Sequence, residues 1–198
     1  VFAAHGVAVD FFVEALFADA VGIEWLRAIV DPVAAAGQGV QLHIHPEWLA
    51  ATPDAGAAVA ARRGPDIGAY EEDDQAALIA RGIANLVAAG APAPVAFRAG
   101  NYGAGPGTLR AVARNGIAFD TSYNPCYLAR NCRMSLGTLL QQPAAIEGVT
   151  EVPITVYFDR PGHLRHFQLG ACSGEELARV IERAFAAGWR TLVLVSHS

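Results

Sequence analysis

The chain has 198 residues, of which 53% are hydrophobic, with 20 glycines and 11 prolines. This size and composition fit one globular domain with a substantial core. The formal net charge is −5 and all 14 basic residues are arginines, so we expect no nucleic-acid partner. No apolar run approaches the roughly 18 residues of a membrane span, and without lysine there is no Schiff-base or P-loop lysine chemistry.

Predicted strands and helices alternate along the chain. The first residues, 1–6, are typical of the last turns of a helix closed by Gly6, and the last apolar run stops at Ser198 inside a predicted strand. We therefore expect a fragment, incomplete at both ends, of one domain over residues 1–198. The predicted strands are 7–13, 40–44, 94–100, 117–122, 150–159 and 191–198, and the predicted helices are 23–36, 71–90, 106–116 and 173–188.

Two of these helices carry strong boundary signals. Residues 71–90 begin with four acidic residues, which suits the helix dipole, and Gly90 closes the segment. Ser173 and Glu176 have the spacing of a capping box at the start of the last helix. Strands that alternate with such helices predict an α/β fold with a parallel sheet or barrel.

In parallel α/β folds the functional site forms at the carboxyl ends of the strands. Several predicted strands finish in an ionisable residue, which packing does not require. These residues are Glu14, His43, His45, Arg98, Asp120, Asp159 and His197. We expect several of them to meet at one rim. His163 and His166 fall outside this pattern, and we predict that they lie in a loop.

His43 and His45 are the most informative pair. Side chains two residues apart in a strand point the same way, so the two imidazoles can bind one divalent ion, such as zinc. A third protein ligand is needed, and Glu47 is an alternative ligand to His45. The competing interpretation is two ordinary polar residues at a strand end.

The other strand ends have competing interpretations too. Arg98, followed by a glycine-rich turn, suits the fixing of a carboxylate or the exposure of backbone amides to an oxyanion; a surface ion pair is the alternative. Asp120 is a catalytic candidate or the start of an Asx-type turn. His197 is a candidate general acid or a capped core residue.

Five segments, in this order, resemble the NodB-type polysaccharide deacetylases, carbohydrate esterase family 4 in the broad sense. They are "HGVAVDFFVE", "LHIHPEW", "FRAGNYG", "GIAFDTS" and "LVLVSHS". The usual histidine motif of that family spaces its ligands four residues apart, whereas here they are two apart, so the chain is similar to a divergent HxH branch.

The resemblance implies a distorted (β/α) barrel and a hydrolase that removes acetyl groups from N-acetylated sugars of a polysaccharide, peptidoglycan or glycolipid. It implies a divalent metal ion, with Zn²⁺ as the expected ion, held by one aspartate and two histidines. The paired aspartates of the family's first strand have no counterpart before Val1. We therefore expect this chain to lack that strand and to be inactive by itself.

The resemblance also implies roles for particular residues. Arg98 would orient the catalytic aspartate, the Asn101–Tyr102 backbone would help to hold the oxyanion, and His197 would protonate the leaving amine. An aromatic rim for sugar stacking would come from Trp48, Tyr102 and Tyr123, with core packing as the alternative for each.

Three questions stay open from the sequence. An amidohydrolase-type metal hydrolase and an inactive carbohydrate-binding relative are the competing functions. The oligomeric state is open, and so is the compartment, between a bacterial cytoplasm and a cell envelope.

Cys126 and Cys132 are more simply reduced thiols than a disulfide or half of a zinc site.

Overall fold

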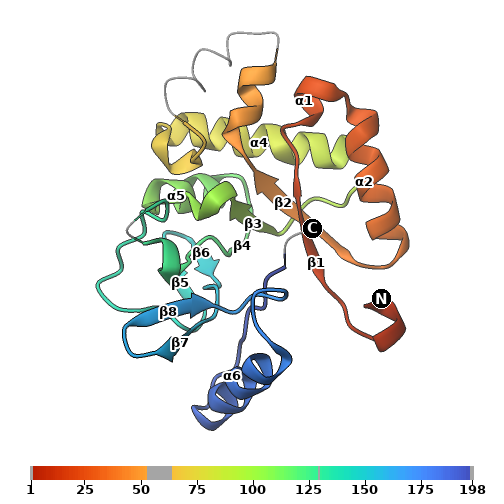
Figure 1. The fold of residues 1–198 in the computed structure, drawn as a ribbon. Helices are drawn as coiled ribbons and strands as arrows, with labels where there is room; N and C mark the ends of the chain where they lie inside the picture. The colour runs from red at the N-terminus through yellow and green to blue at the C-terminus, as the bar shows by residue number, and fades with distance from the viewer. Residues whose placement is uncertain (1, 53–63, 129, 197–198) are drawn as a thin grey trace.

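A six-stranded sheet lies at the centre of the fold (Figure 1). The structure is a computed structural model and describes residues 2–52, 64–128 and 130–196. The strand order is β1-β2-β3-β4-β6-β5, and every pair is parallel except β5 with β6. The strands are β1 (Asp10–Glu14), β2 (Gly39–Ile44), β3 (Ala96–Ala99), β4 (Phe119–Asp120), β5 (Ala144–Ile146) and β6 (Val149–Glu151).

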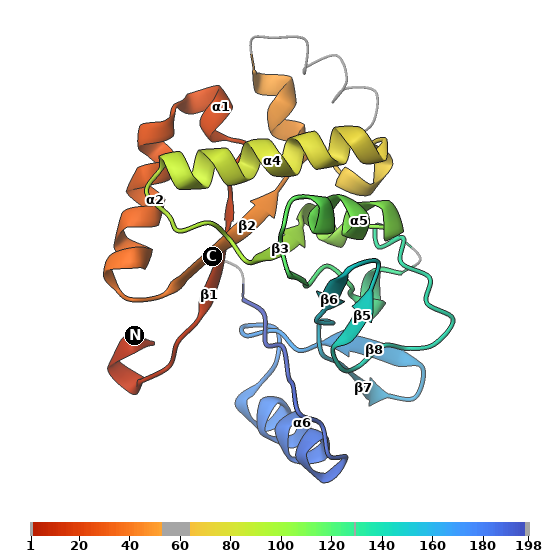
Figure 2. The same cartoon turned by 180° about the vertical axis from the view of Figure 1, so that it is seen from behind.

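Helices connect and cover these strands. Figure 2 shows α4 and α5 side by side in front of β2 and β3, with α2 beside the edge strand β1. The helices are α1 (Ala18–Val21), α2 (Ile23–Ala35), α4 (Glu72–Ala88), α5 (Pro106–Arg114) and α6 (Gly174–Ala186). Short 3₁₀ segments are Ala3–His5, Pro46–Ala51, Ile67–Ala69, Gly100–Tyr102 and Pro125–Tyr127. The hairpin β7 (Val156–Arg160) and β8 (His163–His166) forms a separate two-stranded sheet.

Close packing of α4 on β2 is central to the core. Leu42 and Ile44 of β2 are completely buried, and so are Ile79 and Leu86 of α4. Gly82 faces the strand, and a Cβ at that position would lie 2.8 Å from Leu42 Cδ1. The absence of a side chain at Gly82 therefore lets the helix lie directly against the strand that carries the two histidines.

The structure confirms the α/β class with a mostly parallel sheet, and closure into a distorted barrel stays a prediction. The four predicted helices are present, and Ser173 and Glu176 make the predicted capping box. In the described part of 1–6, residues Ala3–His5 form a 3₁₀ segment. The short helix α1 was not predicted, because its four residues are too few to show helical periodicity.

Three predictions about the strands were wrong in detail. Residues 150–159 form two strands, β6 and β7, separated by four residues that include Pro153, which lacks a backbone donor. His163 and His166, predicted in a loop, lie in β8. In the described part of 191–198, only Val195 pairs, through an isolated bridge to Gln168.

Two expectations about the whole chain can also be compared with the structure. None of the helices in the described ranges combines the length and the apolar character that crossing a bilayer takes. Cys126, Cys132 and Cys172 are not joined by disulfides in the structure, and the reduced state of the first two stays a prediction. Burial raises the pKa of the Cys126 and Cys132 thiols, so neither is an activated nucleophile.

The packing of α4 on β2 gives the first prediction. Gly82→Val should lower the free energy of unfolding by about 1–3 kcal/mol, because the new side chain would overlap Leu42 and Ile44. Ala84→Val, at an exposed position of the same helix, should cost less than about 1 kcal/mol. Urea denaturation measures both, and equal losses in the two variants would contradict the close contact.

Candidate active site

His43 and His45 lie side by side at the carboxyl end of β2. Their ring centroids are 4.8 Å apart and the rings are nearly perpendicular, at 82°. His43 pairs in register with Arg98 of β3, and its Nδ1 lies 2.6 Å from the Arg98 carbonyl oxygen. Because a carbonyl can only accept, the bond requires a proton on Nδ1. The neutral ring then has its lone pair on Nε2, the arrangement found in metal-binding histidines.

The position of His45 depends on a hydrogen bond from its backbone and on the space left by Gly100. Its N–H donates to Glu14 Oε2, and its ring lies against Gly100, where a Cβ would be 2.7 Å from the ring Nδ1. The same Nδ1 is 3.2 Å from Glu47 Oε1 but makes no aligned hydrogen bond. Gly100 is thus the residue that allows the imidazole to reach this position.

Glu14 is a half-buried carboxyl on the strand next to the two histidines. It ends β1 in register with His43, and its Oε1 accepts the Leu16 N–H at 2.7 Å. Burial raises the pKa of Glu14 to about 8, and the backbone N–H groups of Leu16, His45 and Ala15 only partly oppose that rise. The sequence placed Glu14 at a strand end but gave it no role, since its contact with His45 joins two strands.

The Arg98 guanidinium lies over the Phe12 ring, with Cζ 4.2 Å from the ring centroid. Its Nε is 3.4 Å from the Thr121 carbonyl oxygen and its Nη2 is 3.5 Å from Thr121 Oγ1. Burial lowers the pKa of Arg98, while the charges of Tyr102, Asp120 and Glu151 raise it; a guanidinium nevertheless stays protonated in proteins. The structure therefore shows a half-buried cation beside the histidine pair, not the surface ion pair that was the alternative.

Asp120 is completely buried and makes the Asx-type turn that the sequence suggested. Its Oδ1 accepts the Ser122 N–H at 2.8 Å, and its Oδ2 accepts the Ser122 hydroxyl at 3.0 Å. Its register partner on β6 is Glu151, also completely buried. Sequence reasoning missed Glu151 because the boundary between β6 and β7 was not recognised, so no strand end was assigned there.

The turn after Arg98 has an uncommon backbone conformation. Asn101 and Tyr102 have φ values of 55° and 57°, and such left-handed residues are concentrated at functional sites. Asn101 is exposed, while the Tyr102 ring is buried against Tyr127, with the ring centroids 5.1 Å apart. Together, His43, His45, Arg98 and Gly100–Tyr102 form what we call the His–Arg rim.

The three aromatic candidates for sugar stacking differ in exposure. Trp48 is half-buried and packs against Phe17, with the ring centroids 5.9 Å apart. Tyr123 is 1% exposed and Tyr102 is 9% exposed, which supports core packing for both rings. Trp48 alone keeps surface on which a sugar could stack.

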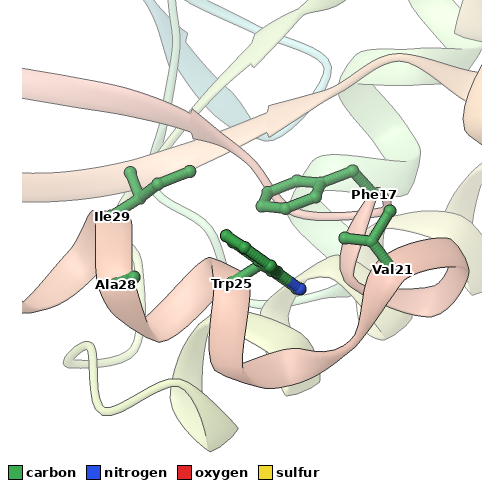
Figure 3. Close-up of a pocket in the computed structure, with 5 residues that line it drawn as sticks. All are labelled: Phe17, Val21, Trp25, Ala28 and Ile29. Atoms are coloured by element: carbon green, nitrogen blue, oxygen red, sulfur yellow. The ribbon is translucent and has the colours of Figure 1, made fainter.

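Asp159 does not join the rim. Asp159 lies in the β7–β8 hairpin, where its Oδ1 is 2.6 Å from His163 Nδ1, so it forms a local pair. His197 is outside the described residues. A separate apolar pocket between α1 and α2, lined by Phe17, Val21, Trp25, Ala28 and Ile29 (Figure 3), contains no ionisable residue and is not the candidate active site.

The rim fits part of a metal site. Two imidazoles on one side of a strand end, one of them oriented by a carbonyl, suit a divalent transition metal. A catalytic zinc takes three protein ligands, and the described residues contain no group of three histidine, cysteine, aspartate or glutamate side chains arranged to hold an ion. The described residues therefore offer a pair of ligands and not a complete set.

Comparison with known proteins supports the fold. The chain is similar to a crystal structure described as a "putative polysaccharide deacetylase from Mycobacterium smegmatis", with a TM-score of 0.53 and 18% sequence identity. The likeness covers 98% of this chain and 59% of that chain, so this chain spans about three fifths of the length of the solved one. No family model matches the chain, and no curated protein matches it. The shared feature is the mostly parallel α/β fold.

The double contact of Glu14 gives the second prediction. Above pH 8, where the Glu14 carboxyl is ionised, Glu14→Gln should lower the free energy of unfolding by about 1–3 kcal/mol, because a glutamine has one acceptor oxygen for the two N–H groups of Leu16 and His45. The NMR shifts of the His45 backbone amide should move with it. Glu182→Gln, an exposed change on α6, is the control and should stay within about 0.5 kcal/mol. An equally stable Glu14→Gln would show that the carboxyl does not hold His45.

Proposed function

We propose that this chain is part of a metal-dependent hydrolase that removes acetyl groups from N-acetylated sugars. The observation that carries the proposal is the His–Arg rim: two adjacent imidazoles and a half-buried arginine on neighbouring parallel strands. This rim lies at the carboxyl edge of the sheet, where parallel α/β enzymes form their sites. The fold is shared with a structure described as a polysaccharide deacetylase, which supports the same substrate class.

In this proposal, His43 and His45 are two of the metal ligands, with Glu47 as the alternative to His45. His43 would bind through Nε2, since its Nδ1 donates to the Arg98 carbonyl. The third ligand would come from outside the described residues. When bound, the ion, for which Zn²⁺ is our expectation, would polarise the acetamide carbonyl and activate a water molecule.

The residues of the chain itself would bind and orient the reacting groups. Arg98 is a half-buried cation held by Phe12 and Thr121 that can orient a carboxylate next to the histidine pair. The left-handed turn at Asn101 and Tyr102 would direct backbone amides toward the negative charge that develops on the carbonyl oxygen. His197 would donate the proton that the leaving amine needs, and Trp48 would stack on a sugar ring.

Metal binding tests the ligand pair directly. In the full-length protein, His43→Ala and His45→Ala should each lose the bound ion and acetate release together, because too few ligands would remain. Elemental analysis after dialysis and acetate release from N-acetylglucosamine oligomers are the measurements. The control is His163→Ala, which removes an exposed imidazole of the β7–β8 hairpin and should change neither.

Different outcomes separate the competing functions. Retention of the ion by His43→Ala would refute the ligand assignment. A bound ion without acetate release, but with turnover of another C–N bond, would favour an amidohydrolase-type enzyme. Saturable binding of the oligomers with no turnover of any acetylated sugar would indicate an inactive carbohydrate-binding relative.

The proton donor requires a separate experiment. His197→Ala should keep the bound ion and lower kcat by on the order of 10²–10⁴. The pH–rate profile should also lose its basic limb, since the group that must be protonated is gone. A variant with unchanged kcat would show that His197 has no chemical role.

A further inference from the structure

A pair of buried carboxyl groups lies beneath the His–Arg rim. Asp120 of β4 and Glu151 of β6 are register partners on adjacent parallel strands, and both are completely buried. Two ionised carboxylates at neighbouring positions in the interior would repel each other strongly. The pair therefore needs either additional positive charge or a proton.

The hydrogen bonds around the pair show which group carries that proton. Both oxygens of Asp120 accept a bond, from the Ser122 N–H and the Ser122 hydroxyl. Glu151 Oε1 accepts the Tyr123 N–H at 3.1 Å, whereas Glu151 Oε2 is buried and accepts no bond. A buried acceptor without a donor is costly. If Oε2 is protonated, it becomes a donor to Asp120, and its position is explained.

The charged groups around the carboxyl pair are consistent with a single proton on the pair. Arg98, from β3, is the cation that interacts with both carboxyls. The Cys132 thiol also faces them, and burial raises its pKa, so it adds no charge near neutral pH. On the other side of β6, the register partner of Glu151 is Ala144, and on α5 Arg110 is occupied by exposed pairs with Glu72 and Glu147. One arginine, one aspartate and one protonated glutamic acid leave the interior neutral.

This group is connected to the rim through the strand ends. The Ser122 hydroxyl, which donates to Asp120, accepts the Ala99 N–H at 2.9 Å. Ala99 lies between Arg98 and the Gly100–Tyr102 turn, and the guanidinium of Arg98 reaches Thr121, the residue after Asp120. A shift of the carboxyl pair would therefore move both Arg98 and the turn.

We propose that Asp120 and a protonated Glu151 form one hydrogen-bonded unit that positions Arg98 and the Gly100–Tyr102 turn at the His–Arg rim. Neither carboxyl touches substrate, so both are positioning residues. Burial raises the pKa of both carboxyls, and that of Glu151 rises well above its usual range because the charge of Asp120 adds to burial, which supports the assignment of the proton. Only the part of the proposal that concerns catalysis rests on the proposed function.

Glu151→Gln tests the proton without any assay of activity. The glutamine amide keeps one acceptor for Tyr123 and one donor for Asp120, so it imitates the protonated acid. At pH 7 Glu14, whose pKa is raised to about 8, gives an infrared carbonyl band of its own, which is identified by its loss in Glu14→Gln. The wild type should show a second such band, from the buried acid Glu151, and this second band should be missing from Glu151→Gln. Its absence from the wild type, or its persistence in Glu151→Gln, would overturn the proposal.

Stability as a function of pH gives an independent test. A raised pKa in the folded state means that the contribution of Glu151 is complete below about pH 4.5, its ordinary value. It is lost as the pH rises toward the folded pKa, by up to about tenfold in the folding equilibrium constant per pH unit. Glu151→Gln should lose this part of the slope, while Glu182→Gln should keep it. Parallel curves for the wild type and Glu151→Gln would contradict the shared proton.

The catalytic part is tested in the full-length protein by acetate release. Glu151→Gln should keep kcat within about threefold of wild type, whereas Glu151→Leu, which has no donor for Asp120, should lower kcat at least tenfold with little change in KM. Equal kcat in the two variants would overturn the positioning role. A wild type without acetate release would refute the proposed function, while the infrared and pH measurements would still decide the state of the carboxyl pair.

Discussion

Parallel pairing of β2 with β3 is the constraint on which the site depends. It places His43 opposite Arg98, so that one hydrogen bond from the imidazole to the Arg98 carbonyl fixes the ring and its tautomer. The same pairing brings the ring of His45 against Gly100. A shift of one residue in register would turn both side chains to the opposite face, and the histidines would no longer lie beside the arginine.

A second constraint is that charge in this interior must be compensated. Arg98, Asp120 and Glu151 lie on three successive strands of the sheet, with Glu14 on its edge strand. Each carboxyl is satisfied mainly by backbone and hydroxyl donors and not by exposed ion pairs. Buried charged groups of this kind contribute little to stability, because the cost of removing them from water offsets their interactions. This is consistent with a role in positioning the rim.

The sequence predicted the parts of this structure that depend on local pattern. Helix boundaries near Ser173 and Gly90 followed from caps, and the strand-end positions of His43, His45 and Arg98 followed from periodicity. Glu151 was missed because its importance arises from its pairing with Asp120, which is distant in sequence. The burial of Tyr123 was also not predictable, since an aromatic residue after a strand end can be in the core or on a rim. The metal ligands and the role of His197 stay predictions.

The central claim is that His43 and His45 together bind one metal ion at the carboxyl edge of β2. X-ray absorption spectroscopy of the zinc-loaded full-length protein tests it most directly, because it reports the ligands of the bound ion. Our account predicts two imidazole rings with zinc–nitrogen distances of about 2.0–2.1 Å and oxygen in the remaining positions. A zinc ion with sulfur ligands at about 2.3 Å, or with oxygen ligands alone, would contradict it.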